Sequence, residues 1–214
     1  MTNPIISAYQ GSDLFGKLIF VSLFFLSIIT WVLFLQKFFM ERAARLQGVE
    51  FQKKCLQNLS TQPENHPFGA LFADLHSVMA ERLQEHSFFL PVDMDYIRAH
   101  LERSTSFQVR RMEKRVFVLS TIVSLAPFLG LLGTVWGILL TFAELQAGGV
   151  GNANATVMGG LAMALGTTVL GLLVAIPALI AYNYLRSAIR HFAQEMEDFS
   201  KLLLASVELK YARR

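Results

Sequence analysis

The sequence predicts an all-α membrane protein with three transmembrane helices and long cytoplasmic helical extensions. The 214-residue chain is 53% hydrophobic and only 16% charged, which lies well to the membrane side of a soluble globular average. Between positions 116 and 185 a single side chain, Glu144, carries a charge. That run is long enough for two crossings, because one crossing needs about 20 apolar residues.

A first crossing is expected over residues 17–40, after a periplasmic N-terminal tail over residues 1–16. The apolar run 18–35 is longer than the core of a cleaved signal peptide. Gln36 and Lys37 follow it, in place of an Ala-x-Ala-like cleavage site. We therefore expect this segment to remain in the protein as a membrane helix.

Basic residues predict the orientation of the chain. Eleven of the 19 Lys and Arg residues lie within 41–115 and six more follow position 185, whereas 145–155 contains none. Short basic loops stay in the cytoplasm. We therefore expect a cytoplasmic helical loop over 41–115, a periplasmic hairpin over 145–155 and a cytoplasmic C-terminal helix over 186–214. The N-terminus is then periplasmic.

The second and third crossings are expected over 116–144 and 156–185. Before them, apolar residues at helical spacing predict a separate helix between Pro67 and Pro91. A further helix, capped by Asp93 or Asp95, is expected to run into the second crossing, because no breaker occurs before Pro127. From Asp95 to Glu144 it would form one continuous rod of roughly 75 Å.

The C-terminal tail carries an apolar seam at steps of three and four residues. Its members are Tyr182, Leu185, Ile189, Phe192, Met196, Phe199 and Leu203. Such a seam predicts a helix that packs against partners along its length. The pattern is compatible with packing inside one subunit and with packing between subunits.

Soluble enzyme chemistry has no support in the sequence. The single cysteine, Cys55, excludes an internal disulfide, and the five histidines do not follow a metalloprotease pattern. No phosphate-binding loop or paired-carboxylate site occurs. We expect no enzyme activity, no cofactor and no metal, and a formal charge of only +3 gives no reason to expect nucleic-acid binding.

Small and hydroxylated residues form a stripe on each of the last two crossings. The stripes are Ala126, Gly130, Thr134, Gly137 and Thr141 on the second crossing, and Gly160, Ala164, Thr168, Gly171, Ala175 and Ala178 on the third. Tight helix packing in lipid explains such faces. They also suit a narrow polar path for protons, beside which Pro127 and Pro177 would kink the helices and free backbone carbonyls.

A proton path made of hydroxyls needs a group that can hold the proton. Glu144 is the only carboxylate of the two-crossing block, and it lies near its outer end. The titrating carboxylate would therefore come from another chain with an intramembrane Asp or Glu.

Two long motifs resemble those of a known family. Residues 126–138 read APFLGLLGTVWGI, residues 171–178 read GLLVAIPA, and residues 181–183 read AYN. Their order and separation are similar to those of the TolQ/ExbB branch of the MotA/TolQ/ExbB proton-channel family. The three-crossing layout and the large cytoplasmic loop match that branch as well.

The resemblance implies a proton-channel or motor subunit of the bacterial inner membrane. It implies a homo-oligomer, five subunits in the family, around an ExbD- or TolR-like single-helix partner whose membrane Asp carries the proton. Proton-motive force would then drive a TonB- or TolA-like periplasmic protein in outer-membrane transport or integrity. Thr134 and Thr168 match the hydroxyls that face the partner's Asp, whereas Gly130, Gly137, Thr141, Ala164 and Gly171 are expected to line the pore or pack helices.

One departure from the family leaves a second function open. Met163 occupies the position of a glutamate that the family usually has on the third crossing, five residues before Thr168. The alternative is a non-conducting structural scaffold that positions partner proteins in the membrane. A solute transporter acting alone is disfavoured because midplane polar sites and repeats are missing from the sequence, and a flagellar stator because that branch has four crossings.

Overall fold

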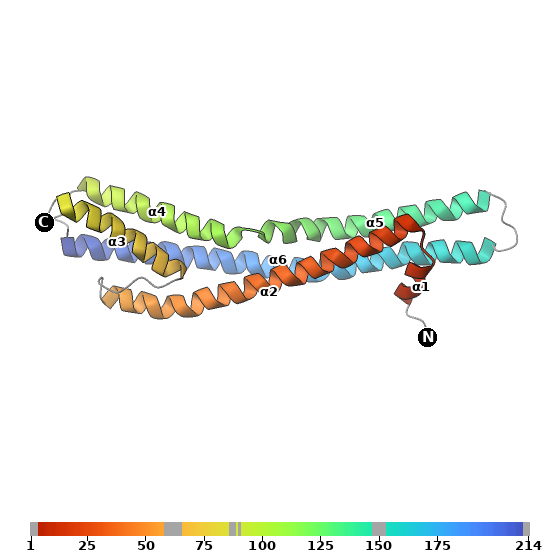
Figure 1. The fold of residues 1–214 in the computed structure, drawn as a ribbon, viewed down its shortest axis with the longest axis horizontal. Helices are drawn as coiled ribbons and strands as arrows, with labels where there is room; N and C mark the ends of the chain where they lie inside the picture. The colour runs from red at the N-terminus through yellow and green to blue at the C-terminus, as the bar shows by residue number, and fades with distance from the viewer. Residues whose placement is uncertain (1–3, 58–65, 86–88, 90, 147–152, 212–214) are drawn as a thin grey trace. The chain divides into compact units, whose positions relative to one another are not determined.

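The computed structural model describes residues 4–57, 66–85, 89, 91–146 and 153–211. These residues form the helices shown in Figure 1, which are α1 (Pro4–Gln10), α2 (Leu14–Gln57), α3 (Pro67–Glu85), α4 (Pro91–Glu113), α5 (Val116–Gln146) and α6 (Ala153–Tyr211). The segments Leu14–Ala44, Pro91–Gln146 and Val157–Lys210 each contain a window long and apolar enough to cross a membrane. The chain is thus an all-α, multi-pass membrane protein with three such helices, as the sequence predicts.

The chain divides into two compact units. We call Met1–Leu35 with Arg115–Tyr184 the membrane unit, and Gln36–Lys114 with Leu185–Arg214 the charged unit. The sequence of the membrane unit contains only four charged side chains, which are Asp13, Lys17, Arg115 and Glu144. Most of the expected hairpin 145–155 lies outside the described residues.

Three helices meet in the core of the membrane unit. Ile19 and Leu23 of α2 pack with Ile122 and Ala126 of α5 and with Val174, Ala175 and Ala178 of α6. Large apolar side chains such as Phe24, Val135 and Ile180 point outward and are exposed, which suits a surface in contact with lipid. Hydroxyls on this surface, such as that of Thr121, donate to carbonyls one turn earlier in the same helix.

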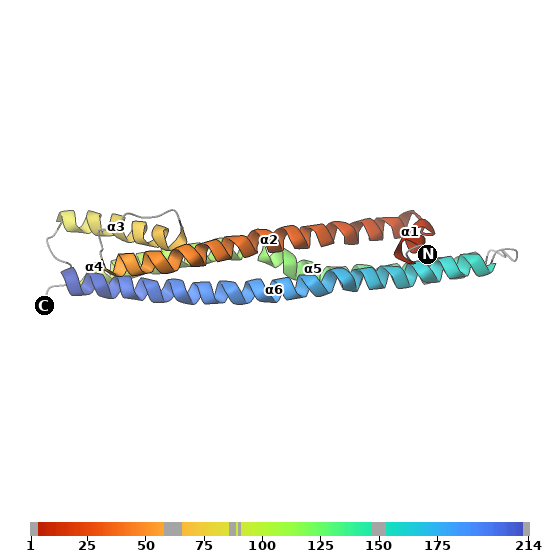
Figure 2. The same ribbon diagram turned by 90° about the horizontal axis from the view of Figure 1, so that it is seen from below.

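The short helix α1 turns back beside the start of α2 (Figure 2). The rings of Tyr9 and Phe20 meet edge to face with centroids 5.8 Å apart. On α6, a Cβ added at Gly166 would lie 3.2 Å from the Cβ of Ala8. Residues 4–10 of the expected N-terminal tail therefore form a packed helix of the membrane unit.

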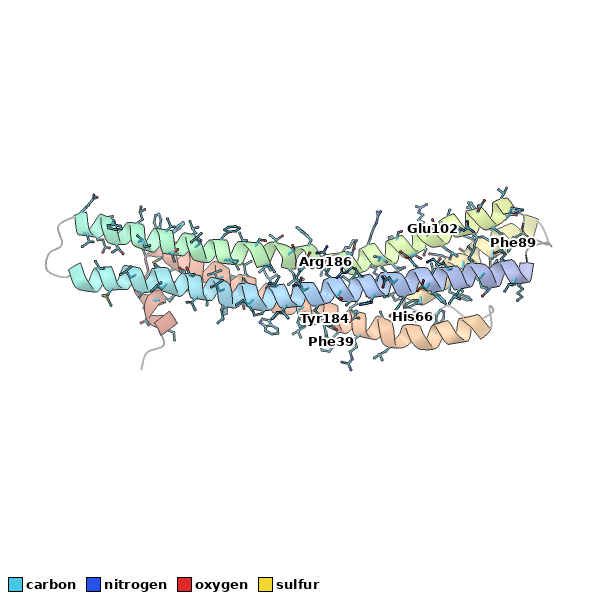
Figure 3. The ribbon with its side chains drawn as sticks, turned by 180° about the vertical axis from the view of Figure 1, so that it is seen from behind. Phe39, His66, Phe89, Glu102, Tyr184 and Arg186 are labelled. Atoms are coloured by element: carbon cyan, nitrogen blue, oxygen red, sulfur yellow. The ribbon has the colours of Figure 1, made fainter. Side chains whose placement is uncertain are left out.

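The core of the charged unit is aromatic. Phe68 of α3 contacts both Phe192 and Phe199 of α6, with ring centroids 5.7 Å apart in each pair. The C-terminal apolar seam therefore packs inside its own chain. His66 stands just before α3 (Figure 3), where its Nδ1 accepts a hydrogen bond from the backbone N–H of Gly69 at 3.1 Å. This contact caps the helix at Pro67.

The continuous rod expected from Asp95 to Glu144 is wrong. Helix α4 ends at Glu113, and α5 begins at Val116. Between them Arg115 has a φ of 70°, in the left-handed region. The sequence contains no glycine or proline at this point. Beside the break, Lys37 of α2 donates to the carbonyl of Met112 at 2.8 Å.

Candidate functional site

The two predicted stripes of small residues face each other at the interface between α5 and α6, where the backbones of the two helices approach closely. A Cβ added at Gly171 would lie only 2.7 Å from the carbonyl oxygen of Ala126, and one added at Gly130 would lie 3.0 Å from the carbonyl oxygen of Thr167. We call this contact the α5–α6 seam, formed by Ala126, Gly130, Gly133, Gly137 and Thr141 of α5 and by Gly160, Ala164, Thr167, Thr168 and Gly171 of α6. Small residues allow the close approach, as in other membrane helix pairs.

Thr168 makes a hydrogen bond across the seam. Its hydroxyl donates to the carbonyl of Gly130 at 3.2 Å. In an α-helix that carbonyl also faces the N–H of the residue four positions later, here Thr134. The Gly130 carbonyl therefore accepts two hydrogen bonds, one from the side-chain hydroxyl of Thr168 and one from the backbone N–H of Thr134.

The hydroxyl of Thr134 is satisfied within its own helix. It donates to the carbonyl of Leu131 at 2.6 Å, and the side chain is partly exposed. Thr141 likewise donates to the carbonyl of Gly137 at 2.8 Å. The structure thus places Thr168 at the seam, whereas the hydroxyl of Thr134 is bonded within α5.

Thr167 is a seam hydroxyl that sequence reasoning missed. It is fully buried, donates to the carbonyl of Ala164 at 2.9 Å and lies 3.4 Å from the carbonyl oxygen of Gly130. Its spacing could have identified it, because it lies three residues after Ala164 and four before Gly171. Thr167 fills the seam, whereas Thr168 lies at its edge and is only partly buried.

The seam separates two flanks of the helix pair. Around α6, Thr168 and Met163 lie about 140° apart, and around α5, Thr134 and Trp136 lie about 160° apart. Met163 is 2% exposed and clusters with Ala8, Phe20 and Trp136. Met163 and Trp136 thus face α1 and the start of α2, whereas the two threonines lie on the opposite flank.

Asp13 ties the start of α2 to the flank of Trp136. Its Oδ2 accepts a hydrogen bond from the indole Nε1 of Trp136 at 3.0 Å, and its Oδ1 accepts one from the backbone N–H of Gly16 at 2.9 Å. The ring centroids of Phe15 and Trp136 lie 4.4 Å apart. Sequence reasoning did not connect Asp13 with Trp136, because 123 positions separate them.

The environment of Asp13 favours its ionised form. Burial acts to raise the pKa of Asp13, but hydrogen bonds from Gly16, the Trp136 indole and Phe15 outweigh it and hold the pKa below its ordinary value. Asp13 is therefore an anchored anion at neutral pH. No hydrogen bond in the described part of the chain joins Asp13 or Glu144 to Thr134 or Thr168.

The two prolines lie within unbroken helical segments. Pro127 is inside α5, next to the seam residue Ala126, and Pro177 is inside α6, next to the core residue Ala178. Each removes one backbone N–H from its helix, so the carbonyl four residues earlier loses its usual donor.

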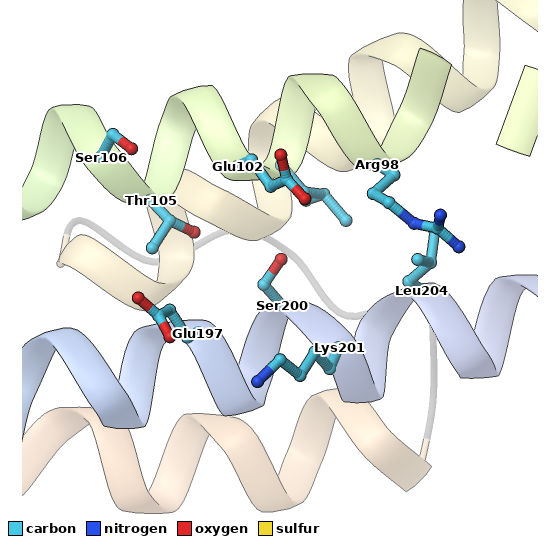
Figure 4. Close-up of a pocket in the computed structure, with 9 residues that line it drawn as sticks. Arg98, Glu102, Thr105, Ser106, Glu197, Ser200, Lys201 and Leu204 are labelled. Carbon is cyan, nitrogen blue, oxygen red and sulfur yellow. The ribbon is translucent and has the colours of Figure 1, made fainter. Parts of the chain in front are cut away.

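A separate cavity of about 460 Å³ lies in the charged unit between α4 and α6 (Figure 4). Arg98, Glu102 and Thr105 line it from α4, and Glu197, Ser200 and Lys201 line it from α6. The lining thus contains two cationic and two anionic side chains. Across the described ranges, no group of three or more His, Cys, Asp or Glu side chains is placed to hold a metal ion.

Comparison with known proteins matches residues 72–198 to the model of the MotA/TolQ/ExbB proton channel family. The chain is similar to "Biopolymer transport protein ExbB" of Pseudomonas putida, with 35% identity over 210 residues, 95% of this chain and 64% of the relative. The protein of that name from Aquifex aeolicus is 48% identical over 81 residues, 38% of this chain and 54% of the relative. The chain thus spans less than two thirds of the length of these two relatives.

A third relative is covered more evenly. The "Biopolymer transport protein ExbB" of Neisseria meningitidis serogroup A is 30% identical over 191 residues, 84% of this chain and 86% of the relative. The family match includes all of α4 and α5 and most of α6, and therefore the whole α5–α6 seam.

Proposed function

Because the chain belongs to the MotA/TolQ/ExbB proton channel family, we propose that it is a proton-channel subunit of an energy-transducing complex in the bacterial inner membrane. In this proposal, proton-motive force drives a TonB- or TolA-like periplasmic protein that serves outer-membrane transport or integrity. A proton that falls through 100 mV supplies about 2.3 kcal/mol. That is enough to shift the balance between two packings of a helix interface.

The observation that carries the proposal is the hydrogen bond from Thr168 to the Gly130 carbonyl, with Thr134 on the same flank. A hydroxyl can pass a proton along but cannot hold it as a carboxylate can. Neither Asp13 nor Glu144 hydrogen-bonds to these threonines within the described residues. The titrating carboxylate must then come from a partner that lies along the threonine flank.

The partner in this proposal is an ExbD- or TolR-like protein with one membrane helix and an Asp within it. The large apolar residues Leu131, Val135 and Ile138 are exposed beside Thr134. They would pack against that helix and against neighbouring copies of this chain in a homo-oligomer of about five subunits, the family number. The basic residues on one side favour a periplasmic N-terminus and a cytoplasmic C-terminus.

Proton flux into proteoliposomes tests the proposal. The chain is reconstituted with and without its partner at a fixed membrane potential, and the internal pH is followed with a trapped dye. We expect flux only with the partner, and a variant of the partner whose membrane Asp is replaced by Asn should abolish it. Equal flux with wild-type and Asn partner would contradict the assignment of the titrating group to the partner.

A non-conducting membrane scaffold is the second candidate. The burial of Met163, an apolar residue within the flank that faces α1, favours it, because this flank then contributes no titratable group from α6. A scaffold would assemble with the same partner and show no partner-dependent flux. The flux measurement therefore separates the two candidates, and co-purification with the partner does not.

A further inference from the structure

The break between α4 and α5 occurs where the local sequence favours a helix. Residues 92–126 contain neither glycine nor proline, and both residues of the break, Lys114 and Arg115, are good helix formers. In Figure 1 the two helices are joined by a short irregular connection. Local preference alone would therefore make one helix of the whole stretch.

Arg115 adopts an unfavourable conformation at the break. Its φ of 70° is the only positive value among the described non-glycine residues. For an L-residue with a Cβ the left-handed region is disfavoured by about tenfold, which corresponds to ~1.4 kcal/mol. A residue held there needs compensating contacts from elsewhere in the structure.

Lys37 supplies such a contact from α2. The side chain is 8% exposed, and its Nζ donates to the carbonyl of Met112 at 2.8 Å. In a continuous helix that carbonyl would accept from the N–H of Val116, four residues later. The buried ammonium group therefore replaces the backbone donor that the break removes. At the start of α5, the backbone N–H of Val118 donates to the carbonyl of Arg115 at 3.2 Å.

We propose that the α4–α5 junction is a two-state hinge. In one state the helix is broken, with Arg115 left-handed and Lys37 bound to the Met112 carbonyl. In the other state the Met112 carbonyl accepts from Val116 and the helix runs through. Local helix preference favours the continuous state, and the hydrogen bond from Lys37 to the Met112 carbonyl favours the broken state. Removing that bond should therefore shift the balance toward the continuous helix.

The hinge would give the channel a place to change shape during a transport cycle. Helices α2 and α6 are continuous over Leu14–Gln57 and Ala153–Tyr211, whereas the α4–α5 path is interrupted at Lys114 and Arg115. A proton-driven shift of α5 would then be either taken up by a change in the Arg115 backbone or transmitted to α4. This use of the hinge rests on the proposed channel function, whereas the existence of two states does not.

Distance measurements by electron paramagnetic resonance test the two states. Spin labels are placed with Phe107→Cys and Phe128→Cys in a Cys55→Ser background, because both phenylalanines are exposed and Cys55 is the only native cysteine. Their backbone positions are 21 residues apart, or about 31 Å in a continuous helix. Dilution with unlabelled chains removes contacts between copies, and the chain is measured at full length in detergent.

Arg115→Ile is the main variant, since a β-branched residue tolerates a right-handed helix but strongly resists a positive φ. We expect it to raise the ratio of continuous to broken helix, which shifts the distance distribution toward about 31 Å. Lys114→Ile is the matched control: it removes the same charge one position earlier, outside the left-handed site, and should leave the distance distribution unchanged. Lys37→Met should move the distribution in the same direction as Arg115→Ile.

An unchanged distribution in both Arg115→Ile and Lys37→Met would overturn the hinge, and so would an equal shift in Lys114→Ile. If Arg115→Ile does not fold, Arg115→Gly decides, because glycine adopts the left-handed region freely. It should remove any population at the continuous-helix distance and raise the melting temperature. A lower melting temperature would count against the hinge. None of these readouts depends on proton flux, so the hinge and the channel function can fail separately.

Discussion

The hydroxyl of Thr168 on α6 donates to the main-chain carbonyl of Gly130 on α5, 38 positions earlier in the chain. This contact joins the two helices at the edge of their closest approach and on the flank where Thr134 also lies. It links helix packing to the proposed proton path, because the hydroxyl that bonds α6 to α5 is also the group that would relay the proton.

Thr168→Val is expected to abolish partner-dependent proton flux while the complex still assembles. Valine is nearly isosteric with threonine but cannot relay a proton, and interhelical hydrogen bonds in membranes contribute only about 0.6 kcal/mol on average. Thr121→Val is the matched control, since Thr121 donates to Phe117 in its own helix and lies outside the seam. Wild-type flux in Thr168→Val would remove Thr168 from the pathway.

Gly171→Ala is expected to destabilise the membrane unit by about 1–3 kcal/mol. The added methyl group would lie 2.7 Å from the carbonyl oxygen of Ala126 and 3.1 Å from the Cα of Gly130, so the two helices would have to separate. Thermal unfolding in detergent measures the effect. Gly159→Ala, where a Cβ meets nothing within 4 Å, should be neutral or stabilising, because alanine favours a helix more than glycine does. Equal losses in both variants would show that steric contact at the seam is not the cause.

Asp13→Asn is expected to lower stability at neutral pH and to make stability less sensitive to acid. The folded pKa of Asp13 lies below the ordinary value of 3.8. The ionised side chain therefore contributes stability that is fully present above pH 3.8 and is lost as the pH falls through the folded pKa. Unfolding curves between pH 3 and pH 7 measure this difference, with Glu144→Gln as a control on an exposed carboxylate.

A Trp136→Phe variant extends the same test. It removes the indole donor but keeps an aromatic ring beside Phe15. If the Asp13–Trp136 hydrogen bond is the cause, the losses in Asp13→Asn and Trp136→Phe should not add in the double variant. Additive losses would mean that the two residues act independently.

Met163→Glu is expected to be less stable than Met163→Gln, which has nearly the same shape without the charge. Met163 is 2% exposed, and an ionised carboxylate that is buried without a partner loses its hydration, which is unfavourable. Asp13 adds repulsion, because a Cβ built on Gly16 would lie 2.9 Å from the Met163 sulfur and 3.0 Å from Oδ1 of Asp13. Adding Asp13→Asn should recover part of the loss; equal stability of the Glu and Gln variants would contradict this account.

Features that depend on many residues at once could be predicted from the sequence. Each crossing is apolar around its whole circumference, so no single contact decides whether it is a membrane helix. The seam was predictable for a similar reason, since small residues at steps of three and four place Gly130 and Thr168 on helix faces that must be covered.

Features that depend on one long-range contact could not be predicted. Nothing in the sequence near Arg115 signals the break, and Lys37, which donates to the carbonyl of Met112 beside it, lies 75 positions before Met112. The pairing of Asp13 with Trp136 has the same character. The acceptor of Thr168 was hidden for another reason, because every residue has a carbonyl and the sequence does not show which one a neighbouring helix approaches.

The acceptor on α5 is a backbone group, and this has a consequence for genetics. No codon change at Gly130 can delete its carbonyl, so substitutions there will report crowding and never the loss of the polar group itself. An alanine scan of α5 would then score this position as purely steric, and a comparison of related sequences would record only a preference for glycine. Replacing the amide that follows Gly130 with an ester, which weakens that carbonyl as an acceptor, would expose a contribution that side-chain mutagenesis cannot reach.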